Sequence, residues 1–300
     1  MTDIAFIIPC FNEEDSISLV IKEIKELFPD SNIFVCDNNS KDNTREYALA
    51  AGAEVFYEKN KGKGNAVRRL LRDIDAEIYI MVDGDNTYNL TNLKKAVKEF
   101  KEGFYDLMTG DRFYRKGKSD FRRGHKIGNI IFTLFFKKLF GIKTKDVFSG
   151  LRIFSRRLVK SFPLVSSEFE IETELSIYAS RMRLPCKDFP TSVVSRANSS
   201  SKLSTYKDGL KILFFSMRLL HREFPLKLYW PLCIFSAFIS IYLFSIPFSE
   251  YNLSGNVTKI PTLITSTIFF TFSIFSFFAG LTLQEISNLK YEQRYLKYLK

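Results

Sequence analysis

Two carboxylates, Asp83 and Asp85, stand directly after the apolar run Ile78–Val82. Consecutive apolar residues that include β-branched and aromatic members predict a strand buried on both faces. In an extended chain the two acids lean to the same side, and Gly84 between them lets a ligand approach the backbone closely. Such a strand exit can hold a divalent cation or the polar groups of a nucleotide. A solvated turn is the competing interpretation.

Two further polar clusters follow strands predicted earlier in the chain. Residues 9–13 follow a strand predicted at 4–8, and residues 37–40 follow one at 33–36. Helical patterns at 13–28, 44–51 and 65–74 separate these strands, and this alternation predicts a largely parallel α/β sheet with crossover helices. The three clusters would then share one sheet edge, which favours a ligand with several distinct groups. Asp37 alone could also be an ordinary turn residue.

The segment Lys59–Asn65 concentrates cationic side chains and glycines just before a predicted helix. Backbone N–H groups and cations at a helix start can cradle phosphate. The segment is not the phosphate loop of nucleoside triphosphatases, because no Gly-Lys-Ser/Thr follows at the required spacing. The stretch from Asp83 is not a calcium loop either, because Tyr88 and Lys94 occupy its glycine and glutamate positions.

A basic segment, residues 112–126, precedes the apolar stretch 127–140. Its cations are Arg112, Arg115, Lys116, Lys118, Arg122, Arg123 and Lys126. A solvated loop is the default interpretation of such a run. The apolar stretch is too short to span a bilayer and predicts a helix in the membrane interface, as does 210–220. A cationic pocket bordered by such helices suits a lipid phosphate, whereas simple packing of these helices on the sheet is the alternative.

Two stretches, Leu228–Phe248 and Ile260–Gln284, contain no charged residue. Each reaches the roughly 20 residues that cross a hydrocarbon core, so we predict a transmembrane hairpin over 226–285, after a domain over 1–225 and before a basic tail over 286–300. Basic residues crowd the outer flanks of the hairpin, whereas the link between its helices holds only Lys259. By the positive-inside rule the domain and both termini are expected in the cytoplasm.

Charge is unevenly distributed in the 300 residues, whose net charge is +11. Residues 1–110 carry 14 Lys and Arg against 20 Asp and Glu, and the remainder carries 30 against 13. Because the basic excess flanks apolar runs, it favours an anionic membrane surface over nucleic acid. Four scattered cysteines and two histidines argue for a reducing compartment and against zinc. No signal peptide is expected at the N-terminus.

The ordered set of motifs resembles family 2 glycosyltransferases of the GT-A type, and within them the dolichyl-phosphate mannose synthase branch. The matching segments are Ile8–Glu13, Asp37–Ser40 with Asp42 and Thr44, Gly62–Gly64, Asp83–Asp85, Thr109–Arg112, Asp146–Arg152 and Ser200–Ser204. The resemblance implies a cytoplasmic GT-A domain, Rossmann-like with a mostly parallel sheet, that passes a sugar from a UDP- or GDP-sugar to a membrane polyprenyl phosphate such as undecaprenyl or dolichyl phosphate.

The resemblance also assigns residues to roles. Asp85 and Asp83 are expected to hold Mg²⁺ or Mn²⁺, with Asp85 the main ligand, and oxygen ligands suit either ion. The donor is expected to contact Pro9, Phe11, Asn12, Glu13, Asp37, Asn39, Lys63, Gly64, Asp83, Gly84 and Asp85. The acceptor phosphate is expected to contact Arg112, Arg122, Arg123, Lys126, Arg196 and Lys202, of which the first three would join the two acids in catalysis.

Two other functions stay open from the sequence. A family 2 enzyme could instead glycosylate a hydroxyl of a glycan or lipid-linked saccharide, with Asp146 as the candidate general base. The chain could also be a membrane-anchored binding protein without catalysis, against which the intact acid pair argues. The two membrane helices could serve as an anchor, as a contact in a homo-oligomer, or as both.

Overall fold

The computed structural model describes residues 2–113, 123–168, 170–193 and 205–300, without the side chains of residues 2, 123–131 and 205–213. Its strands are β1 (Thr2–Cys10), β2 (Asn32–Asp37), β3 (Glu54–Tyr57), β4 (Ala76–Met81), β5 (Leu107–Asp111), β6 (Arg152–Ser155) and β7 (Cys186–Pro190). Its helices are α1 (Ile17–Leu27), α2 (Thr44–Ala50), α3 (Lys63–Asp73), α4 (Leu93–Glu102), α5 (Arg123–Phe140), α6 (Arg156–Ser161), α7 (Ile171–Arg181), α8 (Thr205–Glu223), α9 (Pro225–Ser254) and α10 (Ile260–Leu299). Two compact units result, residues 1–209 with 294–300, and residues 210–293.

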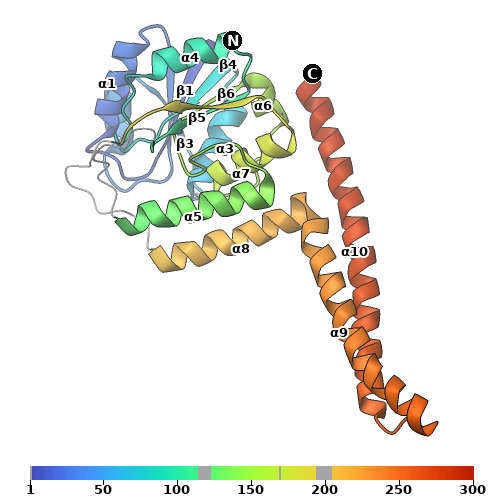
Figure 1. Ribbon diagram of the computed structural model, residues 1–300. Coiled ribbons are helices and arrows are strands. Elements are labelled where there is room, and N and C mark those ends of the chain that lie inside the picture. Colours follow the sequence, from blue (N-terminus) through green and yellow to red (C-terminus); the bar gives the residue numbers. More distant parts are fainter. Residues whose placement is uncertain (1, 114–122, 169, 194–204) are drawn as a thin grey trace. The chain divides into compact units, whose positions relative to one another are not determined.

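The first unit is built on a seven-stranded sheet in the order β3-β2-β1-β4-β6-β5-β7. Figure 1 shows this sheet with helices around it. β6 runs antiparallel to both of its neighbours, and the other pairs are parallel. The mostly parallel α/β fold predicted from the sequence is confirmed. Because β1, β2 and β4 are parallel neighbours, the three polar clusters predicted at their exits come to one edge of the sheet.

The core forms because apolar residues recur at the period of each element. In β4 the side chains of Tyr79, Ile80 and Met81 are fully buried, as expected for a strand covered on both faces. In α1 the buried positions Ile17, Ile21 and Ile24 follow helical spacing. Ser16 precedes α1, and its hydroxyl donates to the Gly84 carbonyl at 2.8 Å, which fixes the helix start to the loop after β4.

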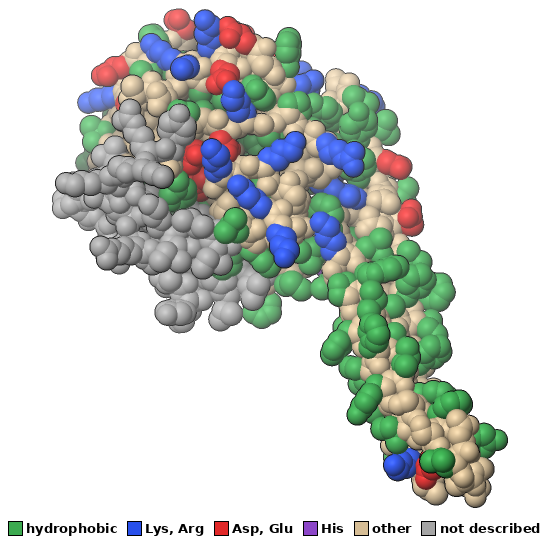
Figure 2. Space-filling view, viewed as in Figure 1, with side chains coloured by type: hydrophobic (Ala, Val, Ile, Leu, Met, Phe, Trp, Pro, Cys, Tyr) green, Lys and Arg blue, Asp and Glu red, His purple; other side chains and the backbone are tan. Residues whose placement is uncertain are grey.

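The second unit contains α9 and α10 up to Gln293, and the apolar windows of these two helices have mean hydropathies of 1.9 and 1.7. These are the two helices, in the part of the chain described, that are long and apolar enough to cross a membrane. The Ser240 hydroxyl donates to the Ser266 carbonyl at 2.8 Å, and the Ser273 hydroxyl donates to the Cys233 carbonyl at 2.9 Å. These bonds join two helices whose outer surfaces are mainly hydrophobic (Figure 2). The predicted stretches 228–248 and 260–284 lie within them, and α10 continues as helix to Leu299.

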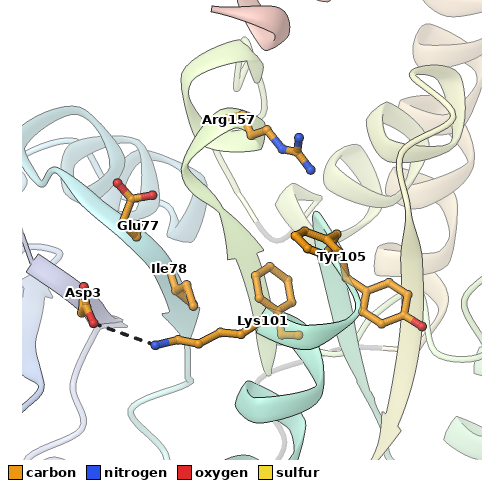
Figure 3. Close-up of a pocket in the computed structure, with 8 residues that line it drawn as sticks. Asp3, Glu77, Ile78, Lys101, Tyr105 and Arg157 are labelled. Atoms are coloured by element: carbon orange, nitrogen blue, oxygen red, sulfur yellow. Dashed lines mark ion pairs between the residues drawn. The ribbon is translucent and has the colours of Figure 1, made fainter.

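The last residues of the chain, 294–300, belong to the first unit. The Tyr298 hydroxyl donates to the Asp106 carboxylate at 2.6 Å, and the Arg157 guanidinium lies 5.1 Å from the Tyr298 ring centre. Asp106 is fully buried and also accepts from Arg157 at 2.9 Å. A hollow of about 330 Å³ lies nearby, at the amino ends of the parallel strands. Figure 3 shows Asp3, Lys101 and Arg157 among the residues that line it. It contains none of the predicted site residues.

Candidate active site

The carboxyl edge of the sheet brings Asp83 against two distant segments. Its Oδ1 accepts from the Lys63 ammonium at 2.5 Å. Its Oδ2 lies only 2.2 Å from the point that a Cβ on Gly150 would occupy, so the glycine makes room for the carboxylate. The Gly150 backbone N–H in turn donates to the Tyr88 hydroxyl at 2.7 Å. The loop before β6 and the loop after β4 therefore build one wall of the site together.

Lys63 opens α3 and contacts a second acid, Glu172, in the first turn of α7. The exposed fractions of the Lys63, Asp83 and Glu172 side chains are 13%, 23% and 5%. Burial by itself lowers the pKa of the Lys63 ammonium, but the two carboxylates outweigh this effect and hold the pKa above its ordinary value. Lys63 is therefore a charged group placed between two anions at the sheet edge.

Asp85 is oriented by its own loop. Its Oδ1 accepts from the Thr87 hydroxyl at 2.6 Å and from the Thr87 backbone N–H at 3.1 Å. This turn fixes the carboxylate two residues after Asp83. The hydrogen bond from Ser16 to the Gly84 carbonyl holds the backbone between the two acids.

The segment after β1 forms a hydrogen-bonded mesh with the segment after β2. The Asn12 backbone N–H donates to the Ser40 hydroxyl at 3.0 Å, and the Asn12 side chain accepts from the Lys41 backbone at 2.9 Å. The Glu13 backbone donates to the Thr44 hydroxyl at 2.8 Å. Asn12 and Asn39 adopt left-handed backbone conformations, which asparagine tolerates better than most residues. The Ser40 backbone N–H also donates to the Asp37 carboxylate at 3.1 Å, so this mesh reaches Asp37, which is itself buried.

The segment Lys59–Asn65, the basic glycine segment, is held by contacts on both sides. The Asn38 amide donates to the Asn60 carbonyl at 2.7 Å, and its oxygen accepts from the Gly62 backbone at 2.6 Å. The Gly64 N–H donates to the Glu168 carbonyl at 3.1 Å, and a Cβ on Gly64 would lie 2.4 Å from the Ser166 carbonyl oxygen. Gly64 therefore permits close packing. Within this segment the Lys61 ammonium lies 5.0 Å from the Phe11 ring centre. Pro9, another predicted donor contact, is buried in β1.

Arg112 stands at the exit of β5 in a two-point ion pair with Asp146. Its Nε and Nη2 contact the two carboxylate oxygens at 2.5 and 2.8 Å, and the Asp146 side chain is fully buried. Burial lowers the pKa of Arg112, but nearby Tyr88 and Asp146 more than reverse this effect. Gly150, whose N–H donates to the Tyr88 hydroxyl, lies against Asp83, and the Asp83 carboxylate also helps to raise the pKa of Arg112, so the ion pair belongs to the same site as the acid pair.

Several predicted site residues cannot be compared with this geometry. Arg122, Arg196 and Lys202 lie outside the described residues, and the side chains of Arg123 and Lys126 at the start of α5 do too. The structure adds Glu172, Tyr88 and Gly150, which the sequence did not assign to the site. The sequence signal for Glu172 is the alternation of acids over Glu168–Glu174, which predicts a helix start, with Glu170 or Glu172 facing the sugar as the second interpretation, and not a partner for Lys63.

Asp83 and Asp85 fit a metal site in which a bound substrate supplies part of the ligands. Among the described residues no group of three His, Cys, Asp or Glu side chains is arranged to hold a cation. Asp83 and Asp85 can each offer a hard oxygen ligand, which suits Mg²⁺ or Mn²⁺, and the remaining ligands would come from substrate phosphates and water. A cation that is held jointly with the phosphates of a substrate needs no larger carboxylate cluster.

Replacing Gly150 with alanine is expected to reduce kcat/KM by about tenfold or more, because the new methyl group displaces the Asp83 carboxylate. The displaced group is the end of a side chain, so the melting temperature is expected to change little. Steady-state assays and thermal unfolding of the same preparation check both expectations. A normal rate in the folded variant would show that the position of Asp83 is unimportant.

The comparisons with known proteins agree with this geometry. The family model named glycosyl transferase family 2 matches residues 5–162. Glycosyltransferase AglJ of Haloferax volcanii is 34% identical over 209 residues, covering 69% of this chain and 68% of that protein. Protein RfbJ of Shigella flexneri is 42% identical over 124 residues (41% and 96%), and the dolichyl-phosphate hexose transferase of Haloferax volcanii is 31% identical over 157 residues (52% and 68%).

Solved structures support the fold. Glucosyl-3-phosphoglycerate synthase from Mycobacterium tuberculosis, in complex with phosphoglyceric acid, superposes with a TM-score of 0.55 at 24% identity, covering 66% of this chain and 73% of that one. The same enzyme with Mn²⁺, UDP-glucose and glycerol 3-phosphate gives a TM-score of 0.52 at 21% identity, with the same coverage.

The sheet order and the superposition on these solved structures define a GT-A-like fold. More narrowly, the chain belongs to glycosyl transferase family 2, whose model covers more than half of it.

Proposed function

We propose that this glycosyltransferase transfers a sugar, with inversion, from a UDP- or GDP-sugar to a membrane polyprenyl phosphate such as undecaprenyl or dolichyl phosphate. The observation that carries the proposal is the Arg112 guanidinium, fixed on buried Asp146 beside the acid pair. A planar guanidinium recognises phosphate well, and an anchored one loses little freedom on binding. The name of the related dolichyl-phosphate hexose transferase supports the same acceptor class.

The acceptor chemistry agrees with the groups at the site. A phosphate monoester has a second pKa near 6, so it is largely ionised at neutral pH and can attack without a strong general base. It needs a positioned cation instead. A hydroxyl acceptor would need a base, and the candidate, Asp146, has both oxygens in contact with Arg112. This contact favours the phosphate acceptor over the hydroxyl acceptor.

The donor is assigned to the edge formed by β1, β2 and β4. Asp37 and the surrounding mesh suit the nucleoside, and the basic segment 59–65 suits the diphosphate. Bound Mg²⁺ or Mn²⁺ would stabilise the charge that builds on the nucleoside diphosphate as the glycosidic bond breaks. Asp85 and Asp83 are the residues that would hold it. Mn²⁺ together with UDP-glucose in the related synthase structure supports this assignment.

We further propose that α9 and α10 cross the membrane as a hairpin, with the domain 1–225 and the tail 286–300 in the cytoplasm and the helices near 127–140 and 210–220 in the interface. The hydrogen bond from Tyr298 to Asp106 supports the placement of the tail and the domain on the same side of the membrane. Large apolar side chains exposed on the hairpin, including Phe238, Tyr242 and Phe275, suit contact with lipid.

A cysteine placed at exposed Asn256 in the link between α9 and α10 should react with a membrane-impermeant maleimide on intact cells. A cysteine at exposed Glu292 should react only after the cells are permeabilised, because the tail lies on the cytoplasmic side. The unsubstituted protein gives the background from its own cysteines. Labelling of position 292 on intact cells would contradict the proposed orientation.

The direct experiment incubates membranes that contain the protein with radiolabelled UDP- and GDP-sugars and then extracts the lipids. Label should enter a lipid fraction and be released by mild acid, because a sugar phosphate ester is acid-labile. Labelled lipid that resists mild acid would instead indicate transfer to a hydroxyl. No labelled lipid with any donor would exclude the proposed reaction.

A further inference from the structure

We propose that Glu172 is a positioning residue that retains the Lys63 ammonium when the Asp83 carboxylate turns toward the cation of a bound donor. Lys63 and that cation would thus exchange places at Asp83. The inference rests on the proposed nucleotide-sugar donor and adds a role for a residue outside the predicted site. It starts from the observation that one buried ammonium bridges two carboxylates.

The charges at this point require such an exchange. Lys63 is the cation in contact with Asp83 among the described residues, and the same oxygen cannot serve Lys63 and a divalent cation equally well. If Lys63 lost Asp83 and had no other partner, its largely buried ammonium would pay a desolvation penalty. Glu172 removes that penalty because it remains in contact with Lys63. Lys63 is then also a charged donor available to the arriving diphosphate.

The two acids differ in mobility in the way that the exchange needs. Glu172 lies in α7, whose neighbouring residues Ile171, Thr173 and Leu175 are all buried, and its carbonyl accepts from the Ser176 hydroxyl at 2.9 Å. Its side chain is 5% exposed. Asp83 stands in a loop and is 23% exposed. The fixed acid is therefore Glu172, and the acid able to turn is Asp83.

Backbone contacts keep Lys63 and Glu172 together whatever Asp83 does. The residue after Lys63, Gly64, donates its N–H to the Glu168 carbonyl at 3.1 Å, and Asn65 donates to the Ser167 carbonyl at 3.3 Å. A Cβ on Gly62 would lie 2.1 Å from the Ser167 carbonyl oxygen, so this start of α3 is packed tightly on the segment before α7. The loop that carries Lys63 is thus held to the segment before Glu172 at several points.

Manganese binding to the full-length protein in detergent tests the exchange without any turnover. We would measure it by electron paramagnetic resonance, first with Mn²⁺ alone and then with Mn²⁺ and UDP or GDP. With Mn²⁺ alone, Lys63→Met should bind about tenfold more tightly than wild type, because Asp83 loses its competing partner. With Mn²⁺ and nucleotide, Glu172→Gln should bind Mn²⁺ about tenfold more weakly, because Lys63 then depends on Asp83 alone.

The double variant Lys63→Met/Glu172→Gln separates this role from a direct one. Once methionine replaces Lys63, the Glu172 substitution should change Mn²⁺ binding by less than about twofold, since its effect passes through the Lys63 ammonium. UDP and GDP carry no sugar, so a contact between Glu172 and the transferred sugar cannot produce the effect. Glu170→Gln is the matched control, because Glu170 is an acid of the same segment that is not among the partners of Lys63. Thermal unfolding confirms that each variant is folded.

Equal weakening by Glu172→Gln with and without Lys63 would overturn the proposal, because Glu172 would then act on the cation directly. Wild-type affinity in both single variants would overturn it too. Failure of the proposed nucleotide-sugar donor looks different: the wild type would then bind neither UDP nor GDP. The measurement on Lys63→Met with Mn²⁺ alone would still report whether Lys63 competes for Asp83.

Discussion

Replacing Asp85 with asparagine is expected to lower kcat/KM by about 1,000-fold or more, which corresponds to about 4 kcal/mol of lost transition-state stabilisation. The amide keeps an oxygen that can accept from Thr87, so the turn should survive and the melting temperature should stay close to that of wild type. The loss arises because an amide oxygen is a much weaker ligand for a hard dication than a carboxylate is.

Metal titration gives the matching control for Asp85. Wild-type activity should vanish with a chelator and return with Mg²⁺ or Mn²⁺, whereas the Asp85→Asn variant should need far more metal or fail to recover. Thr87→Val removes a hydroxyl contact with the carboxylate but not the carboxylate itself, and should retain most of the activity. Full activity of Asp85→Asn at low metal would contradict the assigned role.

Replacing Asp146 with alanine is expected to destabilise the domain by about 3–5 kcal/mol, because it removes the buried carboxylate that holds the largely buried Arg112 guanidinium at two points. At about 2–4 °C per kcal/mol for a domain of this size, the melting temperature should fall by roughly 6–20 °C. Thermal unfolding in detergent measures the change.

A double variant, Arg112→Met/Asp146→Leu, should regain much of this stability, since a buried ion pair can be replaced by apolar packing. It should nevertheless transfer sugar with an acceptor KM raised about tenfold or more, because the proposed phosphate contact is gone. The comparison separates the structural part of the pair from its functional part. Recovery of both stability and acceptor affinity would show that Arg112 does not contact the acceptor.

The elements that carry the site were predictable because each has a local signature. The run at 78–82 predicted β4, observed as Ala76–Met81, and the helical spacing from residue 13 predicted α1, observed as Ile17–Leu27. The start of α3 was placed at Asn65, two residues late, because the left-handed Gly62 that precedes it is stabilised by contacts with the distant segment around Ser167. A local pattern contains no information about such a contact.

The partnerships inside the site were not predictable for the same reason. Lys63 meets Glu172 across 109 positions of sequence, and Arg112 meets Asp146 across 34. Nothing in the local sequence of any of these residues indicates which opposite charge it pairs with. Asp146 was even considered as a general base, an interpretation that the two-point contact with Arg112 disfavours. Only the folded sheet edge shows which acid serves which cation.

The choice between a phosphate and a hydroxyl acceptor is tested most directly with matched acceptors. Purified protein with Mg²⁺ or Mn²⁺ and the radiolabelled nucleotide sugar that it uses would be given a polyprenyl phosphate or the polyprenol of the same chain length. The proposed function predicts labelled lipid with the phosphate and none with the alcohol. Equal labelling of the alcohol, or transfer to a free saccharide without any lipid phosphate, would contradict it.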